Sequence, residues 1–267
     1  MTLALVTGTS SGIGLHTAIG LAQQGVSVIA TVRETARADA LRSAASDAGV
    51  ELDIRVLEVT DAAAARALVK AVGPLDILVN NAGRGSVGTL EQLSDDQLQE
   101  QLETNYLSVA RLTRLVLPGM RERGSGRIVT VTSVGGVVGQ PFSDAYCAAK
   151  FAVEGLMQSL APVVAPFGID VSIVEPAAVA SSFVGSVDRV TPGPYAAQQQ
   201  AYLDRAAASF ANAQPADEAA ETVIEAAITD APRFRWQTSE AAVRFASLSI
   251  SDLSGSRVLD ATSGWVR

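Results

Sequence analysis

The sequence predicts an α/β protein in which one doubly wound parallel sheet carries helices on both faces. Two observations lead to this prediction. Short apolar runs rich in β-branched residues recur along the chain, and segments with the apolar spacing of helices lie between them. Strands that alternate with helices form βαβ units, whose parallel strands and right-handed crossovers place helices on both faces of the sheet.

Six apolar runs are predicted strands, because parallel strands covered on both faces read as continuous apolar runs. They span residues 3–7, 26–32, 52–57, 75–79, 127–132 and 169–174. The predicted helices span residues 12–24, 35–48, 61–72, 90–122 and 144–161. Gly25 and Gly49 follow the first two helices, as glycines that end a helix commonly do.

The alternation breaks at residues 181–214, a tract of Ala, Ser, Gln and Pro with few periodic signals. Long insertions in compact domains are often binding loops, so this tract is interpreted as a substrate loop or lid, with a plain surface excursion as the alternative. Helical spacing returns at 215–229, and 234–236 is a possible last strand. No linker-like stretch precedes residue 176, so we expect one domain over residues 1–267.

Composition narrows the classes of partner. The 267 residues are 48% hydrophobic with a net charge of −8, which excludes a mainly disordered chain and argues against nucleic acid or an anionic membrane as partner. A single cysteine, Cys147, and a single histidine, His16, argue against an intramolecular disulfide and a metal site. No apolar run approaches the roughly 18 residues of a membrane span. The first residues lack a signal-peptide pattern, so the cytoplasm is the expected compartment.

A glycine-rich turn follows the first predicted strand and opens the first helix. Glycine lets the backbone approach a pyrophosphate, and the helix N-terminus supplies free N–H groups and a positive dipole end. A tight strand-to-helix turn without a ligand is the alternative. The residues of this turn expected to bind a cofactor are Gly8, Ser10, Ser11, Gly12, Ile13 and Gly14.

The end of the second strand indicates which dinucleotide binds. Enzymes that select NAD usually place Asp or Glu here to hold the ribose 2′-hydroxyl, whereas this chain has Val32 followed by Arg33. A guanidinium suits a 2′-phosphate, and the Ser11 hydroxyl can add a donor. NADP(H) is therefore expected in preference to NAD(H). The alternative is that Arg33 is a solvated charge engaged by Glu34.

Tyr146 and Lys150 lie one helical turn apart and share a helix face. A nearby ammonium favours the phenolate and lowers the pKa of the phenol, which makes Tyr146 usable as a proton donor and acceptor. Ser133 follows the predicted strand 127–132, and ligands of open α/β sheets bind beyond the carboxyl ends of strands. Ser133 and the Tyr146 helix are thus expected at the same crevice as the glycine turn. Taken alone, the Tyr146–Lys150 spacing also fits a surface pair.

Together these motifs resemble the short-chain dehydrogenase/reductase family over residues 3–181. The matching residues are Thr7, Gly8, Gly12, Gly14, Asn80, Asn81, Ala82, Gly83, Asn105, Ser133, Tyr146 and Lys150. The resemblance implies a single Rossmann-type domain with a parallel sheet of about seven strands. It also implies a homodimer or homotetramer.

The resemblance further implies a role for each catalytic residue. Ser133 would polarise and orient the substrate oxygen, and Tyr146 would give or take its proton. Lys150 would lower the pKa of Tyr146 and hold the nicotinamide ribose, and Asn105 would hold a water in a proton relay behind Lys150. The other cofactor contacts that it implies, besides Tyr146 and Lys150, are Glu58, Val59, Asn81, Ala82, Gly83, Pro176, Val179 and Ser181.

Several positions depart from the family pattern. Glu58 stands where an Asp is common near the adenine. Ala177 replaces the glycine after Pro176, and because Ala lacks the φ freedom of Gly, a different loop path is expected. Pro162 and Pro166 predict that the Tyr146 helix ends or kinks, since proline costs about 3 kcal/mol inside a helix.

The sequence therefore predicts an NADP(H)-dependent oxidoreductase that interconverts a ketone and a secondary alcohol, working as a ketoreductase. A medium or bulky lipophilic substrate is expected from the aromatic residues of 181–214, which are Phe183, Tyr195, Tyr202 and Phe210. These residues could instead anchor the loop to the core. Two other functions stay open, a non-catalytic NADP-binding sensor or scaffold and a sugar-nucleotide epimerase or dehydratase.

Overall fold

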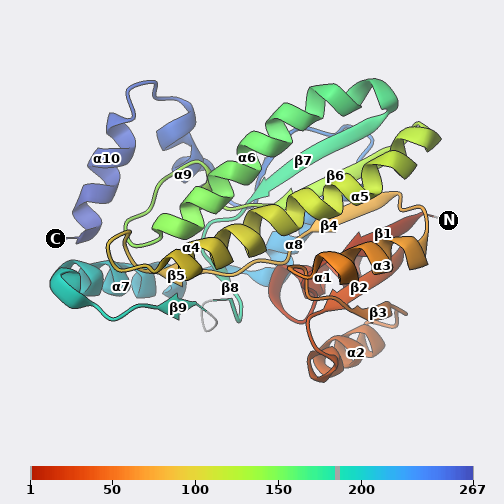
Figure 1. The fold of residues 1–267 in the computed structure, drawn as a ribbon, viewed down its shortest axis with the longest axis horizontal. Helices are drawn as coiled ribbons and strands as arrows, with labels where there is room; N and C mark the ends of the chain where they lie inside the picture. Colours follow the sequence, from red (N-terminus) through yellow and green to blue (C-terminus); the bar gives the residue numbers. More distant parts are fainter. Residues whose placement is uncertain (1, 184–186, 267) are drawn as a thin grey trace.

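The computed structural model describes residues 2–183 and 187–266 and is built around a seven-stranded sheet (Figure 1). The strands are β1 Leu3–Val6, β2 Ser27–Val32, β3 Asp53–Val56, β4 Ile77–Asn80, β6 Gly126–Val131, β7 Ile169–Glu175 and β11 Arg235–Gln237. Their order is β11-β7-β6-β4-β1-β2-β3, and neighbouring strands pair in parallel. From β1 the chain adds β2 and β3 on one side of the sheet and then β4, β6, β7 and β11 on the other side, as in doubly wound sheets. The predicted fold class is therefore confirmed. The single domain stays a prediction.

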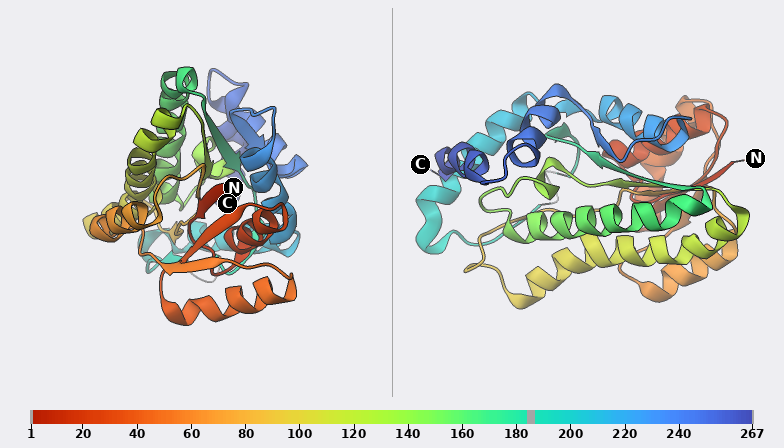
Figure 2. Two further views of the ribbon diagram at one scale, coloured as in Figure 1. Left: turned by 90° about the vertical axis from the view of Figure 1, so that its right-hand side faces the viewer. Right: turned by 90° about the horizontal axis from the view of Figure 1, so that it is seen from above.

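Helices cover both faces of the sheet (Figure 2). One layer holds α1 Gly12–Gln23, α2 Ala38–Asp47 and α8 Ala216–Ile228, and the other holds α3 Ala62–Val72, α5 Ser108–Arg123 and α6 Asp144–Val164. Along β2, Val28 and Ala30 pack in the first apolar cluster, whereas Ile29 between them packs in the second. Successive side chains of a strand point to opposite faces, which explains why the strand sequences are continuously apolar.

The helix expected over 90–122 is interrupted, so this prediction is wrong in its extent. The structure has α4 Asp95–Leu102, a π-helical turn Glu103–Leu107, and then α5. Ser94 sets the start of α4 through a capping box, in which its side chain accepts a hydrogen bond from the Gln97 N–H at 3.2 Å. The Gln97 side chain accepts one from the Ser94 N–H at 2.9 Å, so the first turn cannot begin earlier without losing both bonds.

The tract 181–214 contains more regular structure than its composition indicates. It includes β9 Asp188–Arg189, the 16-residue helix α7 Ala196–Ala211 and the start of β10 Gln214–Pro215. Residues 184–186 of the predicted lid lie outside the described residues. Alanine and glutamine favour helix intrinsically, which explains a helix that buries only Gln199 and so lacks a strong apolar period. The short strands β5 Ser86–Val87 and β8 Val179–Ala180 pair with β9 and β10.

The end of α6 and the helices after β11 also bear on the predictions. Helix α6 passes through Pro162 and ends at Val164, and a 3₁₀ turn Ala165–Phe167 follows, so termination near the prolines is observed. After β11 come two helices that were not predicted, α9 Glu240–Ile250 and α10 Ser256–Ser263. With α7 they lie beyond the carboxyl ends of the strands (Figure 1). None of the described helices is long and apolar enough to span a bilayer.

Two glycines with the same backbone conformation differ in their surroundings. Gly49 has φ +68° and no atom within 4 Å of an added Cβ, whereas at Gly168, with φ +67°, an added Cβ would lie 2.2 Å from the Gly124 carbonyl oxygen. Gly49→Ala is expected to reduce the free energy of unfolding by about 1 kcal/mol through backbone strain. Gly168→Ala should cost about 2–4 kcal/mol because overpacking adds to the same strain. Urea unfolding measures both, and equal losses would contradict this explanation.

Candidate active site

The glycine-rich turn is held against the loop that follows β4. The Thr7 hydroxyl oxygen accepts hydrogen bonds from the Asn81 N–H at 3.0 Å and the Ala82 N–H at 3.1 Å. The side-chain amide of Asn81 donates from Nδ2 to the carbonyl oxygens of Thr7 at 2.9 Å and Gly8 at 3.0 Å. An added Cβ at Gly8 would lie 2.8 Å from the Ala82 Cα, and one at Gly14 would lie 2.3 Å from the Asn81 Nδ2. Glycine is therefore required here by direct contact between two loops.

The start of α1 fits the phosphates of a dinucleotide. Ser11 is the N-cap residue, but its side chain makes no capping hydrogen bond, so the first N–H groups of α1 are not taken up by this side chain. The Ser11 hydroxyl instead lies 2.5 Å from that of Ser182. Gly12 has φ +59°, and an added Cβ would lie 3.0 Å from the Ser181 Cβ. Of the other two predicted residues, Ser10 is half-buried and Ile13 packs against Val179.

The residues expected near the adenosine end differ in what they contact. Arg33 is exposed directly after β2, and its Nε lies 3.7 Å from Glu34, an ion pair that contributes little because both groups are in solvent. The Glu58 carboxylate accepts hydrogen bonds from Thr60, at 3.1 Å from the hydroxyl and 3.3 Å from the N–H. Val59 is buried in the core, so its side chain serves packing. Within the part of the chain that the structure describes, the Arg33 guanidinium thus has no strong partner, whereas the Glu58 carboxylate is engaged by Thr60.

Ser133, Tyr146 and Lys150 converge just beyond the end of β6. Ser133 makes a side-chain hydrogen bond with Tyr146, and its oxygen also accepts the Gly135 N–H at 3.0 Å. Lys150 is buried; its Nζ donates to the Val131 carbonyl oxygen at 3.1 Å and lies 5.8 Å from the Tyr146 ring centroid. The structure therefore brings together the three residues that the sequence placed at one crevice.

Burial controls the protonation of this group. It raises the pKa of Tyr146 well above its ordinary value, and the hydrogen bond with Ser133 opposes that shift. It also lowers the pKa of Lys150 to about 8, with the charge of Glu154 acting in the opposite direction. The expectation that Lys150 lowers the pKa of Tyr146 stays a prediction, since the net shift of Tyr146 is caused chiefly by burial and does not isolate the effect of Lys150. Desolvation disfavours both charged forms, and the ammonium is directed to the Val131 carbonyl oxygen.

Asn105 lies behind Lys150 in the π-helical turn and is fully buried. Its Oδ1 accepts the Arg84 N–H at 3.1 Å, and its Nδ2 donates to the Arg84 carbonyl oxygen at 2.9 Å and to Gln101 Oε1 at 3.0 Å. An added Cβ at Gly83 would lie 2.9 Å from Asn105 Oδ1 and 3.6 Å from Lys150 Nζ. Gly83 thus lets Asn105 and Lys150 approach the same point, and π turns are frequent at functional sites.

The loop after β7 spans the distance from Ser133 to the glycine-rich turn. The Pro176 carbonyl oxygen accepts the Val134 N–H at 2.9 Å, Val179 packs against Ile13, and Ser181 lies against Gly12. Among the described residues, Phe142 is the one non-glycine residue with positive φ, so Ala177 follows a path that needs no glycine. The loop therefore reaches the glycine-rich turn even though Ala177 replaces the glycine of the family pattern.

Aromatic residues of the predicted lid, residues 181–214, line one side of the candidate site. The Phe183 ring centroid lies 6.0 Å from that of Tyr146. The Tyr202 ring lies 5.8 Å from Phe142, and its hydroxyl lies 3.0 Å from that of Ser143. By contrast, Tyr195 donates to Glu91 at 2.5 Å, and Phe210 is 37% exposed. Two of the four expected aromatic residues thus adjoin the catalytic group.

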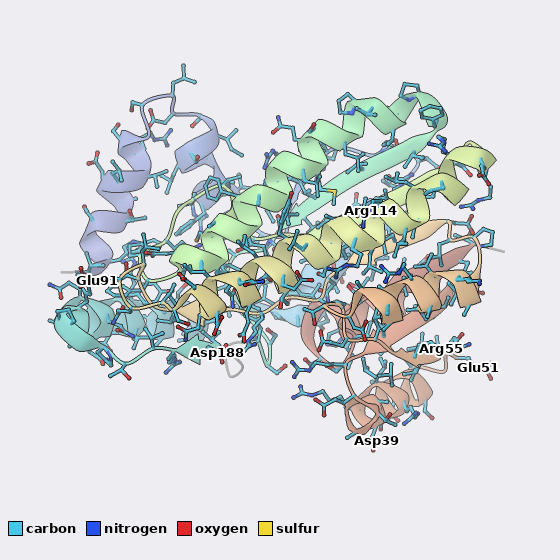
Figure 3. All side chains as sticks on the ribbon, viewed as in Figure 1. Asp39, Glu51, Arg55, Glu91, Arg114 and Asp188 are labelled. Carbon is cyan, nitrogen blue, oxygen red and sulfur yellow. The ribbon has the colours of Figure 1, made fainter. Side chains whose placement is uncertain are left out.

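Contacts that the sequence analysis missed fasten the lid to the body of the protein. Arg84, whose backbone binds Asn105, forms ion pairs with Glu100 at 3.2 Å and with Asp188 of β9. On the other side of the lid, Gln92 Nε2 donates to the Pro192 carbonyl oxygen at 2.6 Å. Glu91 and Asp188 are labelled in Figure 3. Because the pairs of Arg84 with Asp188 and of Gln92 with Pro192 join residues about 100 positions apart, no local pattern in the sequence predicts them.

A family model described as short chain dehydrogenase matches residues 2–190. The chain belongs to the short-chain dehydrogenase/reductase family. It is therefore an oxidoreductase, and a nicotinamide dinucleotide is the cofactor typical of this family. The match ends within the lid, so the family model does not extend over α7 to α10.

Similar proteins include two human oxidoreductases. The chain is 37% identical over 280 residues to 17-beta-hydroxysteroid dehydrogenase type 1 of Homo sapiens, covering 97% of this chain and 84% of that protein. It is 43% identical over 188 residues to retinol dehydrogenase 8 of Homo sapiens, covering 68% of this chain and 60% of that protein. A solved structure of an actinorhodin polyketide ketoreductase variant with NADPH matches with a TM-score of 0.77 and 33% identity, covering 88% of this chain and 95% of that one.

Cys147 follows Tyr146 in sequence but is enclosed by the core, and burial raises its pKa to about 11. At pH 8 the thiolate, which is the reactive form, is then only about a thousandth of the thiol. We expect an aromatic disulfide reagent to leave the folded protein unmodified over minutes and to titrate one thiol in 6 M guanidinium. Rapid native reaction would show that the thiol is accessible.

Proposed function

We propose that this protein is an NADP(H)-dependent reductase that converts a ketone of medium or bulky lipophilic character into a secondary alcohol, and also catalyses the reverse reaction. The observation that carries the proposal is the convergence of Ser133, Tyr146 and the buried ammonium of Lys150 beyond the end of β6. These three groups lie at the same sheet edge as the glycine-rich turn, where open α/β sheets bind ligands.

Ser133 and Tyr146 act on the substrate oxygen. The Ser133 hydroxyl orients that oxygen, and the Tyr146 hydroxyl donates a proton to it in reduction or accepts one in oxidation. Because burial raises the pKa of Tyr146, the phenol holds its proton at neutral pH, and this supports a role as the acid in the reductive direction. When bound, the nicotinamide group supplies the hydride for reduction or accepts it in oxidation.

Lys150 and Asn105 support Tyr146 from behind. With a pKa of about 8, Lys150 is mostly an ammonium at pH 7, and this positive charge stabilises a phenolate as the proton leaves. The same ammonium is the group that would hold the nicotinamide ribose. Asn105, fixed by Arg84 and Gln101, is the residue that would hold a water through which Tyr146 regains its proton.

The cofactor contacts are proposed for residues that the structure leaves suitable for them. Gly8, Gly12 and the first turn of α1 would hold the pyrophosphate, since glycine admits close backbone approach there. Arg33 would bind the 2′-phosphate, because its one ion pair among the described residues is the weak contact with Glu34. The loop from Pro176 to Ser181 would bind the nicotinamide amide.

The substrate class is supported by the aromatic side of the site and by the relatives. Phe183, Phe142 and Tyr202 offer apolar surface beside Tyr146. The similar proteins include a hydroxysteroid dehydrogenase, a retinol dehydrogenase and a polyketide ketoreductase. A homodimer or homotetramer stays the expected assembly, and the exposed side chains of Phe151, Val163 and Phe167 would suit such a contact.

Tyr146→Phe removes the hydroxyl and leaves the ring. We expect turnover in a panel of ketones with NADPH to fall about 10²–10⁴-fold, the range of general acid–base catalysis, with little change in NADPH binding followed by fluorescence. Retained turnover would exclude the acid role of Tyr146. NADPH binding without turnover of any ketone by the unmodified protein would instead favour the non-catalytic sensor.

Arg33→Ala tests the choice of cofactor. Losing a guanidinium that pairs with a phosphate is expected to lower kcat/KM for NADPH about 10–100-fold, corresponding to roughly 1.5–3 kcal/mol, and to leave NADH almost unchanged. Arg42→Ala is the matched control, since Arg42 is also exposed and pairs with Asp39 on α2. Equal effects of Arg33→Ala on both cofactors would contradict the assignment.

A further inference from the structure

A buried cluster of charges lies directly behind the candidate active site. Glu154 of α6 is 4% exposed, and Glu175 at the end of β7 is fully buried. The Arg235 guanidinium of β11 donates to Glu154 Oε2 at 2.8 Å and also pairs with Glu175. Gln237 donates to the other oxygen of Glu175 at 2.7 Å. Neither glutamate takes part in the mechanism described above.

Glu154 is connected to the catalytic residues on two sides. It lies four residues after Lys150, which lies four after Tyr146, so the three share one face of α6. Its Oε1 accepts a hydrogen bond from the Thr132 hydroxyl at 2.6 Å, and Thr132 directly precedes Ser133. One carboxyl group thus joins the catalytic helix to the strand end that carries the catalytic serine.

The position of Glu154 is fixed from a third side. An added Cβ at Gly136, in the 3₁₀ turn after Ser133, would lie 2.9 Å from the Glu154 Cγ. Glycine therefore lets this turn close onto the side chain of Glu154. A carboxylate held by Thr132, Arg235 and the Gly136 turn has little freedom to move away from the Lys150 side of the helix.

The charges in this region balance only when Lys150 is counted. Glu154 is faced by Arg235 from β11, by Glu175 from β7 and by Lys150 on its own helix, and Lys150 is faced by Tyr146 as well. The single guanidinium of Arg235 is shared by two carboxylates, so one negative charge is left for the ammonium. Buried ions are tolerated only when they are paired, because desolvation costs several kcal/mol per ion.

We propose that Glu154 is a positioning residue for the reaction, which keeps the buried Lys150 protonated and, through Thr132, holds the strand end that carries Ser133. Its effect on turnover rests on the proposed function, in which Lys150 acts as an ammonium. The direction of the shifts agrees with this role, since the charge of Glu154 raises the pKa of Lys150 against the effect of burial. The pKa of Glu154 itself is raised to about 7, chiefly by burial.

The two lysines of the chain, Lys70 and Lys150, make the test direct. Protein labelled with ¹³C at lysine Cε gives two NMR signals, and Lys70→Arg assigns them. In Glu154→Gln the midpoint of the Lys150 titration is expected to fall by about one pH unit, the effect of losing one adjacent opposite charge. The exposed Lys70 serves as internal reference. Glu221→Gln on α8, which removes an exposed carboxylate, should leave both midpoints unchanged.

Glu175→Gln gives the opposite test. Removing this second carboxylate leaves Arg235 to Glu154 alone and favours its ionised form, so the Lys150 midpoint should not fall. Should Glu154→Gln fail to fold, Thr132→Val replaces it. That variant removes a hydrogen bond that favours the Glu154 carboxylate and should move the Lys150 midpoint down by a smaller amount. An unchanged Lys150 midpoint in the folded variant overturns the role of Glu154.

Turnover provides a separate readout. The alkaline limb of kcat/KM against pH should shift down in Glu154→Gln by the same amount as the NMR midpoint, which a purely structural role would not produce. An NMR shift without a shift of this limb overturns the positioning role. Absence of carbonyl reduction by the unmodified protein overturns the proposed function instead, so the two failures are distinguishable.

Discussion

The contact between the first turns of α6 and the end of β6 is the constraint on which the site depends. Lys150 is buried, and its Nζ donates to the carbonyl oxygen of Val131, the last residue of β6. The same packing places Tyr146 against Ser133 two residues beyond that strand. A buried ammonium is costly without partners, so the helix cannot rotate or slide along the sheet without exposing an unpaired charge. The packing that fixes the position of α6 on the sheet therefore also fixes the geometry of the site.

The parallel sheet extends this constraint to the rest of the site. Parallel strands end at one edge, and here the loops after β1 and β4 are joined by hydrogen bonds between Thr7, Gly8 and Asn81. The loop after β7 reaches both Val134 and Gly12. Four separate segments of the chain thus touch one another through contacts that have a backbone group on at least one side. Glycine occurs where those backbones come closest, which links the motif in the sequence to a distance in the structure.

Patterns of short range predicted the sheet and the residues that meet at its edge. The strand runs, the glycine-rich turn and the spacing of Tyr146 and Lys150 are local features, and each is found where parallel-sheet topology places it. The π turn at Asn105 and the attachments of the lid were not predictable, because they depend on partners far away in sequence such as Arg84 and Asp188.

The sequence does not show that Tyr146 is enclosed, so the rise of its pKa through burial was not predicted. The sequence could have indicated that Glu154 has a buried partner, because an acidic residue on the apolar face of a helix needs one. Its partner Arg235 lies 81 residues away, however, and only the pairing of β11 with β7 brings it there.

The scarcity of lysine has a practical consequence. Lys70 is exposed near the end of α3, and the chain then turns into β4, so its amine lies at the amino edge of the sheet, opposite the carboxyl edge that carries the candidate site. Lys150 is enclosed in the interior. Amine-directed coupling of lysine side chains to a solid support would therefore attach the folded protein through Lys70, with the candidate site facing the solution.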